Sequence, residues 1–471
     1  MKTECIAEQL EFHALGKREV IGKFNGGKIS SDAGGILLRE VEQRTHILKR
    51  LSECFIDHRN PELIEHSLLS LIQQRCFGIA LGYEDLNDHD ELRQDSLLAL
   101  LCGKEDLTGK QRIQAQDKGK PLAGKSTLNR LELTPLDADK KSRYKKIVAN
   151  ADAMDELLVD LFLESHTTAP EEIVLDVDAT DDPLHGNQEG RFFHGYYKDY
   201  CYLPLYIFCG EQLLCARLRK ANQDGAAGTV EELQPIVSRI RAAWPGVRII
   251  LRGDSGFCRD DILSWCEAHQ VDYIVGLAKN DRLKTLIAKE MEQAREQYKG
   301  TGEAARVFKD FRYQTLKSWS CERRVVGKAE YLGKGENPRF VVTSLPKNEM
   351  AARELYEELY CARGEMENRI KEQQLCLFAD RTSTHEILSN QLRLYFSSFA
   401  YVLIQTLRRL GLAGTRMAKA QCDTIRLKLF KIGAQIRISV RKVWLSFSES
   451  YPYADLFMQI YNKLQQIPLR C

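Results

Sequence analysis

The chain has 471 residues, 44% hydrophobic and 28% charged, which is typical of an ordinary soluble globular protein with more than one core. The formal net charge is only +2, so affinity for a polyanion has to come from local basic patches rather than from the whole molecule. The 14 cysteines form no C-x-x-C pair and no short framework, which argues against a zinc knuckle or a disulfide scaffold and favours a reducing compartment.

Basic residues gather in two stretches of the chain. Residues 408–444 carry ten Lys or Arg against the single acid Asp423, and residues 102–149 carry twelve against six acids. The first residues, MKTECIAEQLEF, place acids where a signal peptide needs an apolar core. The apolar stretch 392–410 is bounded by arginines and falls short of the ~20 residues that a bilayer requires. We therefore expect a cytoplasmic protein without a membrane partner, in which this stretch is a buried helix.

Residues 1–168 predict a mostly helical domain, because apolar residues recur there at helical spacing. Residues 103–125 lose this periodicity and predict a loop or mobile segment. The expected elements are a hairpin around residues 25–27, one helix from the Asp32 region through Leu51, helices in 63–82 and 95–103, and a short helix after an N-cap at Ser126.

From residue 169 the pattern changes to apolar, β-branched runs that predict strands. Three strands are followed by helix, strand, helix and strand, which is the order of a ribonuclease H-like core. A right-handed crossover would lay the strand that ends at Asp254 beside the strand that carries Asp178. The expected elements are strands 171–179, 200–209 and 213–220, helix 229–244, strand 247–254, helix 260–270 and strand 271–278.

The remaining chain completes an α/β protein with a ribonuclease H-like core. Residues 169–280 predict the first part of the core, 281–348 a β-rich insertion opened by a polar helix, and 349–385 a helix that completes the core. Residues 386–471 form a basic C-terminal helical and β extension. In it, residues 424–447 alternate as two strands turned at Gly433, with a basic face that includes Arg437 and Arg441.

Three acids stand in separate contexts that bring carboxylates together. Asp178 and Asp254 lie at or near the ends of apolar strands, and Glu367 lies on a helix. Tyr360, Arg363, Glu367 and Lys371 share one face of that helix by their spacing. Hard oxygen ligands from three elements suit Mg²⁺ or Mn²⁺, and two such ions serve phosphodiester chemistry.

Each of these residues also has a simpler interpretation. A single aspartate at a strand end is usually solvated, and Glu367 alone would make a surface pair with Arg363 or Lys371. Asp176 shares the strand face of Asp178 and competes with it as the ligand. The joint occurrence of the three acids, in this order and on these element types, favours the metal site.

The segment 119–126, GKPLAGKS, satisfies the phosphate-loop pattern of nucleotide hydrolases. No buried strand is predicted before it, and only a short helix follows. We therefore interpret it as a loop rather than as a nucleotide site. A DNA-handling protein driven by ATP depends on this loop and would show nucleotide hydrolysis stimulated by DNA.

The chain resembles the DDE transposases of bacterial insertion sequences, transposase DDE domain group 1. The resemblance is to the class whose third motif is Y-x2-R-x3-E-x6-K, which Tyr360, Arg363 and Glu367 fit. Gln374 stands where that motif has its lysine, and Lys371 is the nearest lysine. The chain is similar to insertion-sequence family thirteen-eighty over nearly its whole length. The sequence motifs that carry this similarity are SSDAGG, LDVDATDDPLHG, FFHGYY, ILRGDSGFC and RGEMENRIKEQQ.

This resemblance implies an enzyme that cleaves phosphodiester bonds at transposon ends and transfers the 3′-hydroxyl into target DNA without ATP. It implies two Mg²⁺ ions, for which Mn²⁺ can substitute, held by Asp178, Asp254 and Glu367. The implied partners are double-stranded DNA, as terminal inverted repeats and target, and a second copy in a homodimer. The implied setting is the bacterial nucleoid. The alternative function is a catalytically inactive DNA-binding descendant or a repressor of the element.

The resemblance also assigns DNA contacts. Tyr360, Arg363 and Lys371 would contact the backbone near the cleaved bond, and the N-terminal domain would bind DNA. The basic face with Arg437 and Arg441 is interpreted from its charge alone, either as a DNA contact or as a solvated face. Trp319, in the insertion, would stack on a flipped base as an insertion aromatic does in related transposases. The alternative for Trp319 is a ring packed under the β-layer.

Overall fold

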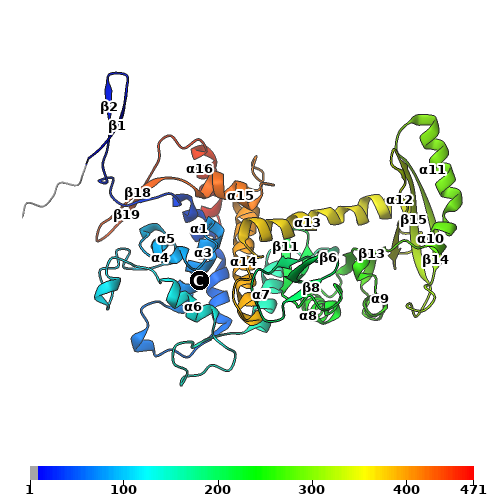
Figure 1. Ribbon diagram of the computed structural model, residues 1–471, viewed down its shortest axis with the longest axis horizontal. Coiled ribbons are helices and arrows are strands. Elements are labelled where there is room, and N and C mark those ends of the chain that lie inside the picture. Colours follow the sequence, from blue (N-terminus) through cyan, green and yellow to red (C-terminus); the bar gives the residue numbers. More distant parts are fainter. Residues whose placement is uncertain (1–8, 471) are drawn as a thin grey trace, which may run out of the picture. The chain divides into compact units, whose positions relative to one another are not determined.

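The computed structural model describes residues 9–470 and divides into two compact units (Figure 1). The first unit comprises Met1–Glu53, Asp57–Val148 and Phe399–Cys471, and the second comprises Cys54–Ile56 and Ala149–Ser398. The prediction that the chain starts without a signal peptide concerns residues 1–12, and residues 1–8 lie outside the described part. Within residues 9–470, no helix is both long and apolar enough to cross a membrane.

The first unit is mostly helical, as its apolar periodicity predicts. Helix α3 shows why such helices form here: Ser67 accepts a hydrogen bond from the Ser70 N–H at its start, and Gly82, at φ 100°, ends it. The expected single helix after Asp32 is broken at His46, whose φ is 55°. The helices are α1 Ile36–Thr45, α2 Ile47–Glu53, α3 Leu68–Leu81, α4 Asp88–Leu92, α5 Ser96–Leu101, α6 Lys125–Glu132, α15 Cys422–Ile425 and α16 Ala454–Gln465.

The N-terminal hairpin differs from the predicted one. Strand β1, Leu10–Leu15, pairs with β2, Arg18–Gly22, and Gly16 at φ 64° opens the two-residue turn between them. Strand β3, Ile29–Ser30, pairs instead with β18, Ala434–Ile438. The hairpin expected around residues 25–27 was therefore wrong, because the strand that follows them finds its partner more than 400 residues later.

The C-terminal strand pair was also predicted only in part. Residues 422–430 are helical, as α15 and a π-helical segment Arg426–Phe430, so the first expected strand was wrong. Ile425 and Leu429 are buried four residues apart, which is one helical turn, whereas Leu427 is exposed. The hairpin is formed by β18 and β19, Val443–Phe447.

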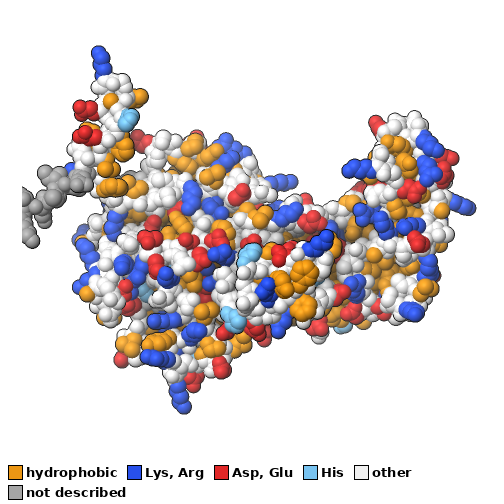
Figure 2. Space-filling model, in the orientation of Figure 1, with side chains coloured by type: hydrophobic (Ala, Val, Ile, Leu, Met, Phe, Trp, Pro, Cys, Tyr) orange, Lys and Arg blue, Asp and Glu red, His pale blue; other side chains and the backbone are white. Residues whose placement is uncertain are grey.

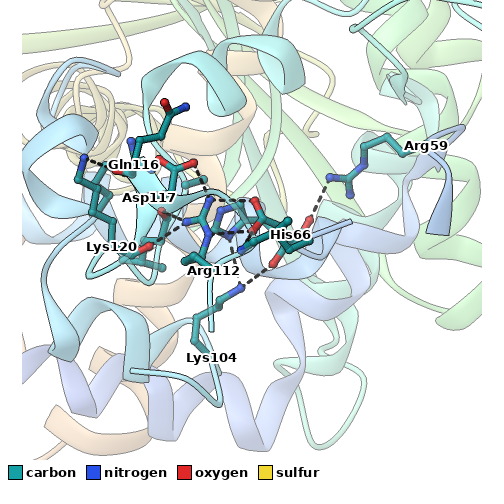
Figure 3. A network of polar contacts seen from close by, with 12 residues as sticks. Arg59, His66, Lys104, Arg112, Gln116, Asp117 and Lys120 are labelled. Atoms are coloured by element: carbon teal, nitrogen blue, oxygen red, sulfur yellow. Dashed lines mark hydrogen bonds and ion pairs between the residues drawn. The ribbon is translucent and has the colours of Figure 1, made fainter. Parts of the chain in front are cut away.

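Residues 103–125 contain little regular structure but are tied down by a polar network (Figure 3). Arg112 donates hydrogen bonds to both oxygens of the Glu65 carboxylate and to the carbonyl of Lys120. Lys104 donates to the carbonyl of Glu65. The segment is a loop, as predicted, with its centre held by Arg112. In the described chain no strand lies between α5 and α6, so the strand that a nucleotide-binding loop requires is missing.

The second unit is built on a nine-stranded mixed sheet, and the predicted α/β class is confirmed for this unit. Its strand order is β11-β10-β6-β12-β13-β17-β15-β14, with β16 paired to β15. Strands β6, β12 and β13 are parallel, and β10 is antiparallel to β6 and β11. The strands are β6 Glu172–Ala179, β10 Leu205–Cys209, β11 Gln212–Arg217, β12 Arg248–Gly253, β13 Asp272–Leu277, β14 Ala305–Tyr313, β15 Arg323–Leu332, β16 Gly335–Glu336 and β17 Arg339–Thr343.

Side chains along β6 alternate between the two faces of this sheet, so one face carries apolar residues and the other carries the acids. Ile173, Leu175 and Val177 point into a large core with helices α7 Ala151–Glu164, α8 Thr229–Ala243 and α9 Asp260–Ala268. Asp176 and Asp178 have the opposite parity. On the same face of the sheet, Leu355 and Tyr356 pack on Ile250 of β12 and Ile274 of β13. The acids thus share a face with one helical segment.

That segment runs from residue 352 to 376 and is called here the Glu367 helix. It consists of α12 Ala352–Glu354, a π-helical segment Leu355–Tyr360, a 3-10 turn Cys361–Arg363, α13 Gly364–Lys371 and a second π-helical segment Glu372–Cys376. Leu355, Met366 and Ile370 are buried, whereas Ala362 is exposed. The next helix, α14 Ile387–Leu407, is buried as expected.

The segment expected as an insertion begins with α10 Asp281–Leu286 and α11 Ala288–Thr301. Its strands continue the main sheet rather than forming another one, because β17 pairs antiparallel with the open edge of β13. Ile287 and Val325 belong to the same hydrophobic core as β6 and β12. The second unit therefore has one continuous sheet from β11 to β14.

Candidate active site

Asp178 and Asp254 lie at the ends of two neighbouring parallel strands. In the register of β6 and β12, Val177 is opposite Gly253, so each aspartate comes one residue after this pair. A Cβ on Gly253 would lie 3.0 Å from Cγ1 of Val177, so the space beside this glycine is filled by the Val177 side chain. Asp254 accepts a hydrogen bond from the Gly256 N–H at 2.8 Å, which fixes its carboxylate at the start of a 3-10 turn.

Arg363 joins the first and third acids. Its Nη1 lies 3.2 Å from Oδ2 of Asp178, and its Nη2 lies 2.7 Å from Oε1 of Glu367. Arg363 and Glu367 are one helical turn apart, so the Glu367 helix presents both to the strand ends. The structure thus brings Asp178, Arg363 and Glu367 together, and the spacing of Arg363 and Glu367 predicts their pairing.

The acids influence one another electrostatically. Burial raises the pKa of Asp178 to about 6, the Arg363 guanidinium opposes this shift, and the negative charges of Asp254 and Glu367 add to it. Burial acts to lower the pKa of Arg363, but the carboxylates of Asp178 and Glu367 hold it above its ordinary value. Three carboxylates around one guanidinium leave an excess of negative charge at the strand ends.

This donor set fits a divalent cation in its chemistry. Carboxylate oxygens from three elements are the ligands that Mg²⁺ and Mn²⁺ prefer, and the excess negative charge favours a cation. Among residues 9–470, however, no three His, Cys, Asp or Glu side chains are grouped closely enough to hold a metal ion as they stand. The ion pairs with Arg363 bridge Asp178 and Glu367 instead, so the three-carboxylate metal site stays a prediction.

The Tyr360 hydroxyl and the backbone of the Asp254 turn both lie close to Gly276. A Cβ on Gly276 would meet the Tyr360 hydroxyl at 2.6 Å and the Ser255 nitrogen at 2.8 Å, so only glycine leaves room for this contact. Burial raises the pKa of Tyr360, and the negative charge of Asp254 adds to the shift. Gly276 was missed from the sequence, although a glycine inside an apolar strand is a known signal for close backbone approach.

Asp176, which competed with Asp178 from the sequence, has a different partner. Arg252 on β12 holds both oxygens of Asp176, with Nε to Oδ1 at 2.5 Å and Nη2 to Oδ2 at 2.8 Å. Both residues are buried. The Asp176 carboxylate is thereby satisfied inside the sheet, which leaves Asp178 as the strand acid beside Arg363 and Glu367.

Gln374, which stands where the motif of the resembled class has its lysine, contacts the segment that follows Asp178. Its Nε2 donates to the carbonyl of Asp181 at 3.0 Å and to Oδ1 of Asp182 at 2.9 Å. Asp182 is completely buried, and burial raises its pKa to about 8. Lys371 is exposed on α13. Gln374 is therefore held by hydrogen bonds within the protein. Lys371, one turn earlier on the same helix, faces solvent.

The other predicted DNA contacts lie elsewhere. Trp319 is only 6% exposed and packs edge-on against Tyr313, with ring centroids 5.9 Å apart, inside the core of the second unit. This position agrees with the packed alternative and leaves no open ring face for a base. Arg437 and Arg441 are exposed in the first unit, Arg437 on β18 and Arg441 in the turn before β19.

Comparisons with known proteins add one firm finding. Residues 12–469 match the family described as transposase DDE domain group 1. No curated protein matches the chain. A cryo-EM structure of a piggyBac transposase synaptic complex with hairpin DNA is 9% identical in sequence, with a TM-score of 0.40 over 92% of this chain and 81% of that chain. A likeness of this size supports no conclusion about the present site.

Proposed function

Because the chain belongs to the transposase DDE domain family, group 1, we propose that it is a DNA transposase of an insertion sequence. In this proposal it cleaves phosphodiester bonds at the element's ends and transfers the freed 3′-hydroxyl into target DNA. The observation that carries the proposal is the convergence of Asp178 and Glu367 on Arg363 beside Asp254. The strand order β11-β10-β6-β12-β13, with β10 antiparallel, supports a ribonuclease H-like core.

Each residue of the site has a proposed task. Asp178, Asp254 and Glu367 would hold Mg²⁺, or Mn²⁺ in its place. When bound, two such ions activate water and stabilise the leaving oxygen of a phosphodiester. Arg363 has its guanidinium between two of the acids, and from there it would donate hydrogen bonds to a phosphate. Tyr360 would orient the same backbone from beside the Asp254 turn.

The remaining proposed partners follow from this chemistry. Terminal inverted repeats and target DNA would be the substrates, and a homodimer would hold two ends together. The exposed Arg437 and Arg441 belong to a stretch of ten basic residues and one acid, which is suited to phosphate contacts. Charge reversal of both arginines would test this contact through a weaker salt dependence of DNA binding.

The test uses the full chain, Mg²⁺ and oligonucleotide duplexes ending in the inverted repeats that flank the coding region. Replacing any one of the three acids is expected to lower end cleavage by at least about a hundredfold, while affinity for the duplex stays within about twofold of the unchanged protein. The substitutions are Asp178→Asn, Asp254→Asn and Glu367→Gln. Glu365→Gln, an exposed acid on the same helix, is the matched control and should cleave normally. Normal cleavage by Asp254→Asn would refute the proposed site, and Mn²⁺ binding by calorimetry gives a readout independent of cleavage.

A further inference from the structure

A short hairpin that follows the Asp178 strand exposes four aromatic rings. Strand β8, Phe192–His194, pairs antiparallel with β9, Asp199–Tyr202, and β9 also pairs with β7, Asp182–Pro183. Residues 191–202 are called here the aromatic hairpin. Its exposed rings are Phe192 at 51%, Phe193 at 49%, Tyr196 at 83% and Tyr200 at 41%.

Three of the exposed rings pack against a neighbouring ring although they are not buried. Phe193 and Tyr200 pack edge to face with centroids 5.5 Å apart, and Tyr196 packs in the same way on Tyr197 at 5.0 Å. An exposed cluster of large rings loses the stabilisation that burial of apolar surface gives. Such clusters mark interaction surfaces. The aromatic hairpin therefore presents exposed rings to a ligand, Tyr196 most of all.

Positive charge accompanies these rings. The Arg191 guanidinium lies over the Tyr200 ring, 3.8 Å from its centroid. Lys198 is exposed at the tip of the hairpin, and the exposed Lys220 runs along Gly190, where a Cβ would meet its Cγ at 2.8 Å. Figure 2 shows apolar side chains gathered with basic ones over the position of β8 in Figure 1. Aromatic faces with interleaved cations are the combination that binds single-stranded nucleic acid.

The aromatic hairpin is also anchored beside the candidate active site. The Tyr197 hydroxyl donates a hydrogen bond to the carbonyl of Ala179 at 3.5 Å, and Ala179 follows Asp178 directly. Burial raises the pKa of Tyr197 to about 12, and the negative charges of Asp181 and Asp178 contribute to this shift. The exposed rings thus belong to the same structural unit as the strand end that carries Asp178.

We propose that the aromatic hairpin is a binding site for unpaired DNA bases next to the bond that is cut. Bases within a duplex already stack on one another, so the rings would engage only bases that have left the duplex. Arg191 and Lys198 would neutralise the adjoining phosphates. This site rests on the proposed function for its substrate, and it supplies the open ring faces that the buried Trp319 does not.

The test measures affinity of the full chain for a fluorescein-labelled oligo-dT single strand and for a duplex of matched length. Tyr196→Ala is expected to weaken single-strand binding by about five- to a hundredfold, the range of losing one stacked base, and duplex binding by less than about twofold. Tyr196→Phe keeps the ring and should bind like the unchanged protein. Tyr461→Ala is the control and should change neither affinity. Tyr461 lies on α16 and is about as exposed as Tyr200.

Several outcomes would overturn the site. Unchanged single-strand affinity of Tyr196→Ala would remove the stacking role, and equal losses on single strand and duplex would indicate a general phosphate contact. A loss in Tyr196→Phe as large as in Tyr196→Ala would assign the effect to the hydroxyl. A change of oligomeric state without a change in DNA affinity would make the surface a protein contact. End cleavage by the unchanged protein, and its loss in Asp254→Asn, tests the proposed function separately.

Discussion

Arg252 and Asp176 form a buried, two-pronged ion pair across the strands that carry Asp254 and Asp178. The two residues are direct neighbours in the register of β12 and β6, and each precedes a site acid by two positions. Nη1 of Arg252 donates in addition to the carbonyl of Leu359, which adjoins Tyr360 on the Glu367 helix. One guanidinium therefore links all three elements of the site.

Replacing Arg252 by alanine is expected to lower the free energy of unfolding by about 3–5 kcal/mol, because the Asp176 carboxylate would remain buried without its partner. Urea denaturation measures this change. Arg248→Ala, on the same strand with a side chain 36% exposed, is the control and should cost less than about 1 kcal/mol. Equal losses in the two variants would show that Arg252 is not the link between the strands.

Cation binding should weaken as pH falls, because the Asp178 carboxyl, with a pKa of about 6, takes up a proton that a bound cation has to displace. Calorimetric titration with Mn²⁺ is expected to show an affinity that falls about tenfold for each pH unit below 6. At a higher cation concentration the site is half occupied at a lower pH, because the cation binds the ionised form of Asp178. Arg363→Gln removes a charge that lowers this pKa and should move the affinity profile to higher pH.

The matched control for this pH profile is Glu365→Gln, which should follow the unchanged protein. An affinity independent of pH between 5 and 7 would contradict the raised pKa of Asp178. An unchanged profile in Arg363→Gln would show that its guanidinium does not act on that carboxyl.

Asp182 should make the protein less stable as pH rises. Its pKa is raised from 3.8 to about 8, so between these values the unfolded chain releases a proton that the folded chain keeps. The contribution of this residue to stability is therefore greatest below about pH 4 and falls by up to about 1.4 kcal/mol per pH unit as pH approaches 8. Asp182→Asn keeps the size of the side chain and should remove this slope.

Urea denaturation at pH 5 and pH 7 checks the Asp182 prediction. Relative to the unchanged protein, Asp182→Asn should gain stability at the higher pH, while Asp181→Asn, one residue earlier, should preserve the slope. Parallel curves for the unchanged protein and Asp182→Asn would mean that this carboxyl is ionised in the folded state.

Gly276→Ala is expected to lower both cleavage and stability. The added Cβ would lie 2.6 Å from the Tyr360 hydroxyl and 2.8 Å from the Ser255 backbone, so the strand or the Asp254 turn has to move, at a cost of about 1–3 kcal/mol. Gly300→Ala, in α11 with open space around the new Cβ, is the control and should be neutral or stabilising. Full activity of Gly276→Ala would show that this close contact is not required.

Much of the second unit follows from local patterns. Apolar β-branched runs predict β6, β12 and β13, and the right-handed crossover predicts that β6 and β12 are neighbours. The i, i+4 spacing predicts the pairing of Arg363 with Glu367. These features depend on residues close in sequence or on a general rule of topology.

Other features depend on register or on distant partners. The ion pair of Arg252 with Asp176 requires the alignment in register of two strands that are separated in the chain by five further strands and helix α8. Strand β3 depends on a partner near the end of the chain. Residues 425–429 satisfied both a strand and a helix pattern, because Ile425 and Leu429 share a face in either conformation. The exposure of the aromatic hairpin also becomes visible only in three dimensions.

Two π-helical segments flank α13, and they set the rotational phase of the Glu367 helix. Each π-helical turn accommodates more residues than an α-helical turn. Removing one residue from Leu355–Tyr360 would turn Arg363 and Glu367 by about 100° relative to the sheet, away from Asp178. Within the family, a one-residue deletion before the third motif is therefore compatible with the site only where a compensating insertion restores that phase.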